Sequence, residues 1–219
     1  MKLTKETLLS LINEEVENQE EIYLDEKLSL KPARNGWKLY SQLVAAAYDA
    51  APMEDLSSRS SYDALEDFIN KFFERMSGKY TIDFVDYHPY SSATEMKNRV
   101  AEEGVLLVST ADDEHPVFSP ETNAKFRAFH DLTGHIQRGL KFSLKHEIAT
   151  YNSHLKLVPP AAVPALFTEV VGQICCFYNS GKSNCEQKAV LLQGFDYFNV
   201  GVVEGYDIVD KELVRKENV

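Results

Sequence analysis

The chain has 219 residues, 44% of them hydrophobic and 26% charged, which is ordinary for a globular protein long enough to bury a core. The formal net charge of −11 argues against nucleic acid as a partner, because an acidic surface repels phosphates. We find no signal peptide. The longest apolar stretch, 161–178, is interrupted by Glu169 and Gln173, so no membrane span is expected. We therefore expect a cytoplasmic protein with no membrane partner.

The three cysteines are Cys175, Cys176 and Cys185. They are too few and too clustered for a disulfide framework. The C-x-x-C spacing typical of a zinc site is absent. We expect them to be buried, reduced thiols.

The first 30 residues differ from the rest of the chain. An amphipathic stretch over 8–16, with Thr4 placed to cap it, is followed by an acidic run over 14–21. The opening, LTKETLLSLINEEV, resembles the starts of many proteins of tailed phages. Because no repeat or linker follows, we expect a leader over 1–30, docked or mobile, and a single globular domain over 31–219.

In the first half of that domain, apolar periodicity predicts helices over 36–51 and 61–76. Partial alternation predicts a strand within 79–87, and a second short strand is expected over 104–110. A short helix over 92–103 would join them. The two strands could pair as a small sheet beside a helical body.

From Ser119 onward the chain is expected to be mostly helical. Ser119 suits the N-cap and Pro120 the first turn of a helix over 119–140. Further helices are predicted over 143–158, from 161 or 164 to 178, and over 185–203, the last either continuous or broken near Gly194. A frayed charged tail is expected over 210–219. The predicted fold class is mainly α (α+β): a helical bundle core from the C-terminal half, with a small two-stranded β element near residues 79–110.

Four of the six histidines lie between residues 130 and 154. In an α-helix each residue turns about 100°, so Asp131 and His135 would share a face, with Arg127 one turn back and His130 at its edge. Gly134 lies among them. Since glycine is unfavourable inside a helix, it would mark a close approach of another backbone or a ligand.

The next two predicted helices carry further polar groups. Glu147, Tyr151 and His154 are spaced i, i+4 and i+7 and so point the same way, whereas His146 points elsewhere and is expected to be exposed. Glu169 lies in an otherwise apolar segment, four residues before Gln173. A carboxylate there is costly unless it is paired, protonated or bound to metal.

Imidazole and carboxylate groups on three neighbouring helices are the donors of a buried transition-metal site. We expect Fe or Mn, as one or two ions, with Zn or Mg as alternatives. Arg127 would bind an anionic substrate group, Tyr151 would donate from the second sphere and Gln173 would orient a ligand. The expected metal ligands are His130, Asp131, His135, Glu147, His154 and Glu169.

A buried polar network, with Arg127 or Arg138 paired to a glutamate, is the alternative interpretation of these residues. Two further histidines, His88 and His115, each precede a proline and are expected in loops. His115 is the better candidate to close over the site, because it lies nearer to the first predicted metal helix.

Three segments, FRAFHDLTGH, HEIATYNSH and ALFTEVVGQ, resemble an uncharacterised family associated with bacteriophage genomes. The resemblance covers about the second half of the chain and implies no activity. The residues that carry it are His115, Asn123, Arg127, His130, Asp131, His135, Glu147, His154, Glu169 and Gln173.

Two functional families resemble parts of the pattern. The Glu147 to His154 spacing, with Glu169 and a helix bearing His and Asp, is similar to haem-oxygenase-like di-iron oxidases, although in those proteins that helix comes last. The His130–Asp131 doublet is similar to that of HD-type phosphohydrolases. Those enzymes need another upstream His and a downstream Asp, for which His88 or His115 and Asp196 are poorly spaced.

The resulting hypothesis is a metal-dependent enzyme, a di-iron or di-manganese oxidase or oxygenase, that acts on a small molecule, with an anion as one option. A metal-dependent phosphohydrolase is the second hypothesis. The third is a phage structural or host-interaction protein in which these residues form a buried network. A homo-oligomer is also compatible with the sequence, and a phage-encoded protein would act in the host cytoplasm.

Overall fold

The computed structural model describes residues 37–76, 78–112, 114–180, 185–203, 205–209 and 212–215. The described part is mainly helical and contains a small parallel two-stranded sheet, which confirms the predicted mainly α (α+β) fold class. The expected leader over 1–30 lies outside the described residues, and the division into a leader and one domain stays a prediction.

The elements of the first half match the predicted helices and strands closely. They are α2 (Trp37–Ala50), the short 3-10 turn η1 (Leu56–Ser58), α3 (Arg59–Met76), β1 (Thr81–Val85), α4 (Ala93–Glu103) and β2 (Val105–Ser109). The Ser92 side chain caps α4 by accepting from the Glu95 N–H, and Gly104 ends the helix at a φ of 73°. Because α4 carries the chain back across the sheet, β1 and β2 pair in parallel, from Thr81–Val105 to Val85–Ser109.

The second half builds the helical body. It contains α5 (Pro120–His130), the π-helical turn η2 (Asp131–Ile136), α6 (Leu144–His154), the 3-10 turn η3 (Pro160–Ala162), α7 (Val163–Phe167), the π-helical turn η4 (Thr168–Gly172), α8 (Gln173–Ser180), β3 (Tyr206–Val209) and β4 (Glu212–Arg215). Ser119 caps α5 and Pro120 opens it, as predicted. Ser143 caps α6 in the same way.

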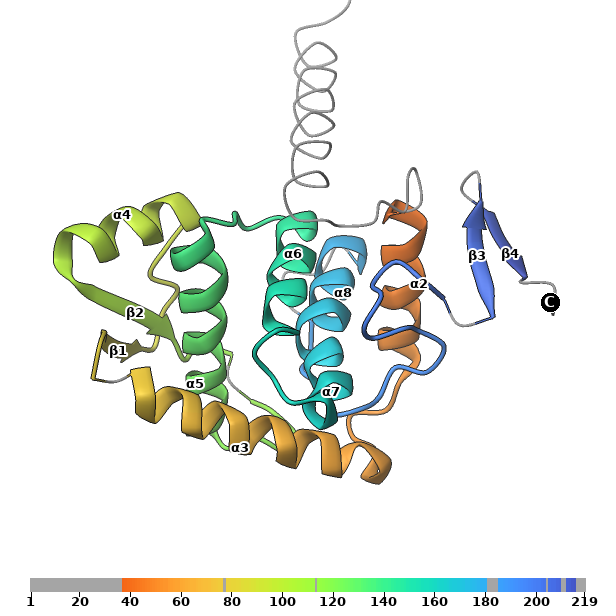
Figure 1. Cartoon of the computed structure of the whole chain (residues 1–219), viewed down its shortest axis with the longest axis horizontal. Coiled ribbons are helices and arrows are strands. Elements are labelled where there is room, and N and C mark those ends of the chain that lie inside the picture. Colours follow the sequence, from red (N-terminus) through yellow and green to blue (C-terminus); the bar gives the residue numbers. More distant parts are fainter. Residues whose placement is uncertain are drawn as a thin grey trace, which may run out of the picture.

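The helices α5, α6, α8 and α2 stand upright in Figure 1, and α3 runs across one end of them. Helix α3 packs on α5 and α7, while α8 packs on both α2 and α6. The unit formed by β1, α4 and β2 lies at the α5 end. This arrangement places α6 and the two π-helical turns in the interior of the helical body.

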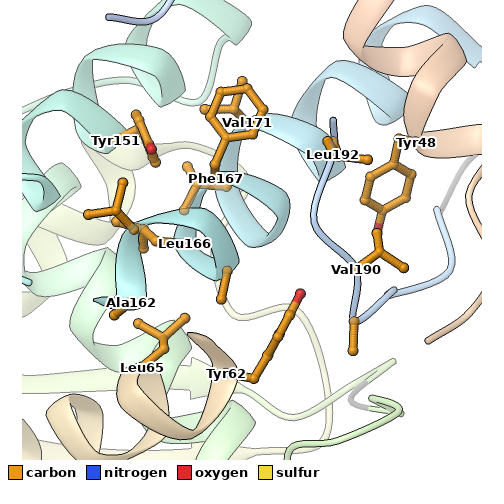
Figure 2. Close-up of a cluster of buried hydrophobic side chains, with 14 of the residues drawn as sticks. Tyr48, Tyr62, Leu65, Tyr151, Ala162, Leu166, Phe167, Val171, Val190 and Leu192 are labelled. Atoms are coloured by element: carbon orange, nitrogen blue, oxygen red, sulfur yellow. The ribbon is translucent and has the colours of Figure 1, made fainter. Parts of the chain in front are cut away.

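The main core lies where α3, α7 and the segment after α8 meet (Figure 2). Tyr62 and Leu65 of α3, Leu166 and Phe167 of α7 and Tyr48 of α2 are almost completely buried there. A smaller cluster under the β unit contains Met96, Leu106, Val108, Ala128 and Leu132. The two clusters therefore hold the helical body in place on the α3 side and on the side of the β unit.

The prediction of a helix over 185–203 is wrong. This segment is irregular and forms isolated bridges between Glu54 and Ala189 and between Phe195 and Val203. Its Lys188 ammonium donates to three carbonyls at the end of α2, at 2.6–3.1 Å. The apolar run packs as extended chain across the core, and the predicted frayed tail contains β4, antiparallel to β3.

The expectation of free thiols also needs correction. Cys176 and Cys185 are joined by a disulfide, with their Cα atoms 6.3 Å apart, and Cys175 is free and buried. The pairing arises because the chain that follows α8 returns to that helix at Cys185.

The continuous helical run Pro160–Ser180 has the length and apolar composition of a membrane span. However, 67% of its most apolar 18-residue stretch is buried inside the fold. It therefore packs as the core helix of a soluble protein does.

Candidate metal centre

The first wall of the site is formed where α5 continues into η2. Residues five apart align in a π-helix, whose hydrogen bonds join i and i+5. The Nε2 atoms of His130 and His135 consequently lie 3.2 Å apart. One ligand atom from each of His130, Asp131 and His135 lies within 4.8 Å of the others, so the prediction that these three side chains share one side is confirmed. The direct contact between the two histidines was not predicted.

Gly134 allows this turn to pack directly on α6. A Cβ atom at this position would lie 2.5 Å from Cγ2 and 2.8 Å from Oγ1 of Thr150. A close approach at Gly134 is present as predicted, but the approaching group is the side chain of Thr150 in α6 and not a backbone or a ligand. The contact brings the histidines of η2 against the polar face of α6.

Glu147, in the first turn of α6, completes a group of two imidazoles and one carboxylate. Its Oε2 lies 3.0 Å from Nε2 of His130, and its Oε1 lies 3.6 Å from Nε2 of His135. The Glu147 side chain is 8% exposed and that of His135 is 2% exposed. Three potential metal donors from two separate elements thus converge in a buried position.

The hydrogen bond of the second ring nitrogen fixes the orientation of His135. Its Nδ1 lies 2.8 Å from the carbonyl oxygen of Leu140, to which it donates. The lone pair of the neutral ring is then on Nε2, which faces His130 and Glu147. This is the usual arrangement behind a metal-ligating histidine.

Burial and neighbouring charges shift the pKa values of this cluster. Burial, assisted by His130, lowers the pKa of His135 to about 4, so its imidazole is neutral at pH 7. Burial also lowers the pKa of His130, but the hydrogen bond and charge of Glu147 outweigh it and the net shift is upward. Burial raises the pKa of Asp131 to about 7, against the opposing charge of His130.

His154 lies directly behind this cluster and has no hydrogen-bond partner at either ring nitrogen among the described residues. Its ring is completely buried, 4.4 Å from the ring of Phe129 and 5.3 Å from that of His130. Burial, and then the charges of His130 and His135, hold its pKa well below the usual range. An orphaned neutral imidazole beside other donors is expected where a ligand normally completes the site.

Glu169 lies in η4 and has partners that the sequence did not indicate. Its Oε1 lies 2.7 Å from the hydroxyl of Tyr62 and 3.1 Å from Nε2 of His115. Nδ1 of His115 accepts the N–H groups of Val117 and Phe118 at 3.2 and 2.9 Å, so Nε2 carries the proton and donates to Glu169. His115 is therefore a positioning donor, because its only lone pair is already used by the backbone.

A cavity of about 420 Å³ connects the two groups. The titratable side chains that line it are His88, Tyr90, Arg127, His130, Asp131, His135, Glu147, Glu169 and Tyr178. His154 does not line the cavity. Of the six expected metal ligands, the structure places His130, Asp131, His135 and Glu147 in one cluster, His154 behind it, and Glu169 elsewhere on the cavity wall.

The other expected site residues have different surroundings. Arg127 lines the cavity, but its guanidinium donates to the carbonyls of Ser109, Ala111 and Asp112 at 2.7–2.9 Å. Gln173 lines the cavity at the start of α8. The hydroxyl of Tyr151 donates to the carbonyl of Tyr197 at 2.8 Å, which places it in the core and away from the cavity.

Two loop and surface expectations have different outcomes. His146 was expected to be exposed but is buried, because its Nδ1 accepts the Lys141 N–H at 2.7 Å as the chain enters α6. His88 lies in a loop, as expected, and its side chain is exposed. His115 was missed as a partner of Glu169, and its His-Pro loop position was the single sequence signal available.

The donor set fits a transition metal. Neutral His135, His130 and a carboxylate provide the mixed nitrogen and oxygen ligands that suit Fe, Mn and Zn alike. The orphaned nitrogens of His154 support a site built for a ligand.

Comparison of the chain with models of protein families, with curated proteins and with solved structures finds no match.

Proposed function

We propose that this protein is a metal-dependent oxidase or oxygenase that acts on a small molecule held in the cavity. The observation that carries the proposal is the convergence of His130, His135 and Glu147 at the cavity wall, with separations of 3.0–3.6 Å between donor atoms. Two histidines and one carboxylate, with the remaining positions open, form the ligand set of non-haem Fe(II) oxygenases. Bound there, an Fe or Mn ion would supply redox chemistry with O₂.

The residues of this chain would bind and orient the ion. The Leu140 carbonyl holds the ring of His135 so that Nε2 is directed to the metal position. These three residues account for one ion. A second ion, as in the dinuclear oxidases that the sequence resembles, would need Asp131 or Glu169 as a further ligand.

A metal-dependent phosphohydrolase is the second candidate. It is favoured by one observation, the presence of the adjacent His130 and Asp131 in the same cluster of potential ligands. In that case the metal would lower the pKa of a bound water molecule. The phage-associated structural role is the non-enzymatic alternative, in which the same side chains form a polar network without metal.

Elemental analysis of the purified protein tests these proposals. We expect stoichiometric Fe or Mn in the native protein, or uptake of one of them when the metal-free protein is reconstituted anaerobically. His135→Ala should abolish uptake. His88→Ala is the matched control, because His88 also lines the cavity but its side chain is 72% exposed and lies outside the donor group.

The metal found separates the candidates. Fe or Mn, with O₂ consumption that depends on the metal, supports the oxidase. Zn or Mg, with metal-dependent cleavage of a phosphate ester, supports the hydrolase. A native protein without metal that takes up none of the four ions would overturn both and leave the structural role.

A further inference from the structure

We propose that the cavity binds a neutral, largely apolar molecule carrying an aromatic ring, and that it selects against anions. This inference names the substrate class of the proposed metal-dependent enzyme and rests on that function for its biological meaning. The binding preference itself depends only on the cavity walls and can be measured without metal.

Apolar side chains form two of the walls beside the donor group. Phe126, Val170 and Ile174 line the cavity on the side of α5, η4 and α8, and Met96 and Leu107 line it on the side of the β unit. The volume of about 420 Å³ is in the range typical of small-molecule sites, roughly 300–1,000 Å³. The walls thus offer an organic molecule burial against apolar surface.

Aromatic residues lie where the cavity reaches the surface. Phe142, Phe177 and Tyr178 all line the cavity and are 39–45% exposed. They hold each other in place, since the Tyr178 hydroxyl donates to the Phe142 carbonyl at 3.3 Å and the rings of Phe177 and Tyr178 are 5.4 Å apart. Exposed aromatic rings at the rim favour a planar apolar ligand, with which they can stack.

The polar groups of the walls are mostly engaged within the protein. Arg127 donates to three backbone carbonyls, the Tyr90 hydroxyl accepts the Leu107 N–H at 3.0 Å, and Cys185 is in the disulfide. Gln173 is the remaining uncharged polar side chain of the helical wall. A ligand therefore finds few hydrogen-bonding groups outside the donor cluster.

The charge of the cavity disfavours an anion. Glu147 and Glu169 both line it, and the chain as a whole carries a net charge of −11. Arg127, which the sequence suggested as the anion-binding residue, is committed to carbonyl oxygens. A negatively charged group would have to displace those bonds or lie beside carboxylates, and both are unfavourable.

Two fluorescent probes with the same ring skeleton provide the test. N-phenylnaphthylamine is neutral, and anilinonaphthalene sulfonate adds one negative charge. On the full-length metal-free protein we expect saturable binding of the neutral probe and at least about tenfold weaker binding of the sulfonate. Equal or tighter binding of the sulfonate would overturn the proposed selectivity.

Variants locate the binding. Ile174→Trp should fill the cavity and abolish binding of the neutral probe, whereas Leu56→Trp, at a position 90% exposed, should leave it unchanged. Phe177→Ala removes a rim ring from an exposed position and should weaken binding severalfold, even if the tryptophan variant fails to fold. Unchanged binding in Phe177→Ala and in a folded Ile174→Trp would place the probe elsewhere and overturn the inference.

Metal content separates this inference from the proposed function. Ile174→Trp should retain metal uptake while it loses the probe. Probe binding without any metal uptake would leave the apolar site standing and remove the enzyme proposal. Metal uptake without probe binding would overturn the apolar site and leave the enzyme proposal standing.

Discussion

The two buried glutamates of the cavity, Glu147 and Glu169, differ in what surrounds them. Glu169 accepts a hydrogen bond from His115, whose tautomer the backbone fixes, and the hydroxyl of Tyr62 lies within reach. Its burial needs no metal. Glu147 faces His130 and His135, and His154, which has no hydrogen-bond partner among the described residues, lies close behind them. This side of the cavity therefore has more lone pairs than N–H groups to pair with them. The apolar setting of Glu169 in the sequence made its burial hard to explain without a partner, and the structure supplies that partner in His115. Glu147 is the glutamate that lies against the histidine cluster.

The largest expected difference between the two glutamates is in metal affinity. Glu147→Gln replaces a donor oxygen at the centre of the group and should weaken metal binding by more than about 100-fold, since even outer-shell changes typically cost 10–100-fold. Glu169→Gln is the matched isosteric control and should change the affinity by less than about tenfold. Competition with a chelator measures both. Comparable losses in the two variants would assign Glu169 to the metal as well and would favour two ions.

In the metal-free protein the order should reverse. Glu169→Ala leaves the Nε2–H of His115 without an acceptor, and we expect the free energy of unfolding to fall by about 2–3 kcal/mol. The Tyr62 hydroxyl loses less, because its single proton can go to the Lys188 carbonyl, 2.9 Å away. Glu147→Ala should lower the free energy of unfolding by less than Glu169→Ala does. Without the carboxylate, Nε2–H of His130 can donate to Nε2 of His135, because the two atoms lie 3.2 Å apart.

Urea denaturation of the metal-free variants measures this order. If Glu147→Ala is the more damaging change without metal, then Glu147 belongs to a structural network and the contrast between the two glutamates fails.

Periodicity predicted most of the helical elements, and Ser119 was the predicted cap among the three serines that cap helices in the structure. Ser92, Ser119 and Ser143 each precede a helix that begins at the next residue, because a short polar side chain satisfies the free N–H groups of the first turn. The helix prediction for 185–203 was wrong because the apolar run of this segment is buried without forming a helix. Periodicity alone does not distinguish a buried non-helical run from a buried helix.

The sequence predicted the grouping of His130, Asp131 and His135, but not the direct contact between the two histidines. The spacing of His130, Asp131 and His135 was interpreted with α-helical geometry, whereas the packing of Gly134 on Thr150 accompanies a π-helical turn that aligns His130 with His135. Such a turn depends on tertiary contacts and has no local sequence signal. The partnership of His115 with Glu169, separated by 54 residues, likewise depends on the fold.

The smallest effect concerns His154, the orphaned side chain on the Glu147 side. Its pKa in the folded protein lies well below 6.5, mainly because it is buried, so between that value and 6.5 the unfolded chain binds a proton that the folded protein does not. Stability therefore falls as the pH drops below 6.5, by up to about 1.4 kcal/mol per pH unit. His154→Phe removes this pH-dependent loss. The stability of the metal-free variant relative to the wild type should therefore increase as the pH falls from 7 to 5. Phe129→Leu, at the ring packed on His154, should shift stability by a constant amount instead. Parallel pH profiles for the wild type and His154→Phe would mean that His154 has a partner, and the unsatisfied group that distinguishes the Glu147 side from the Glu169 side would be lost.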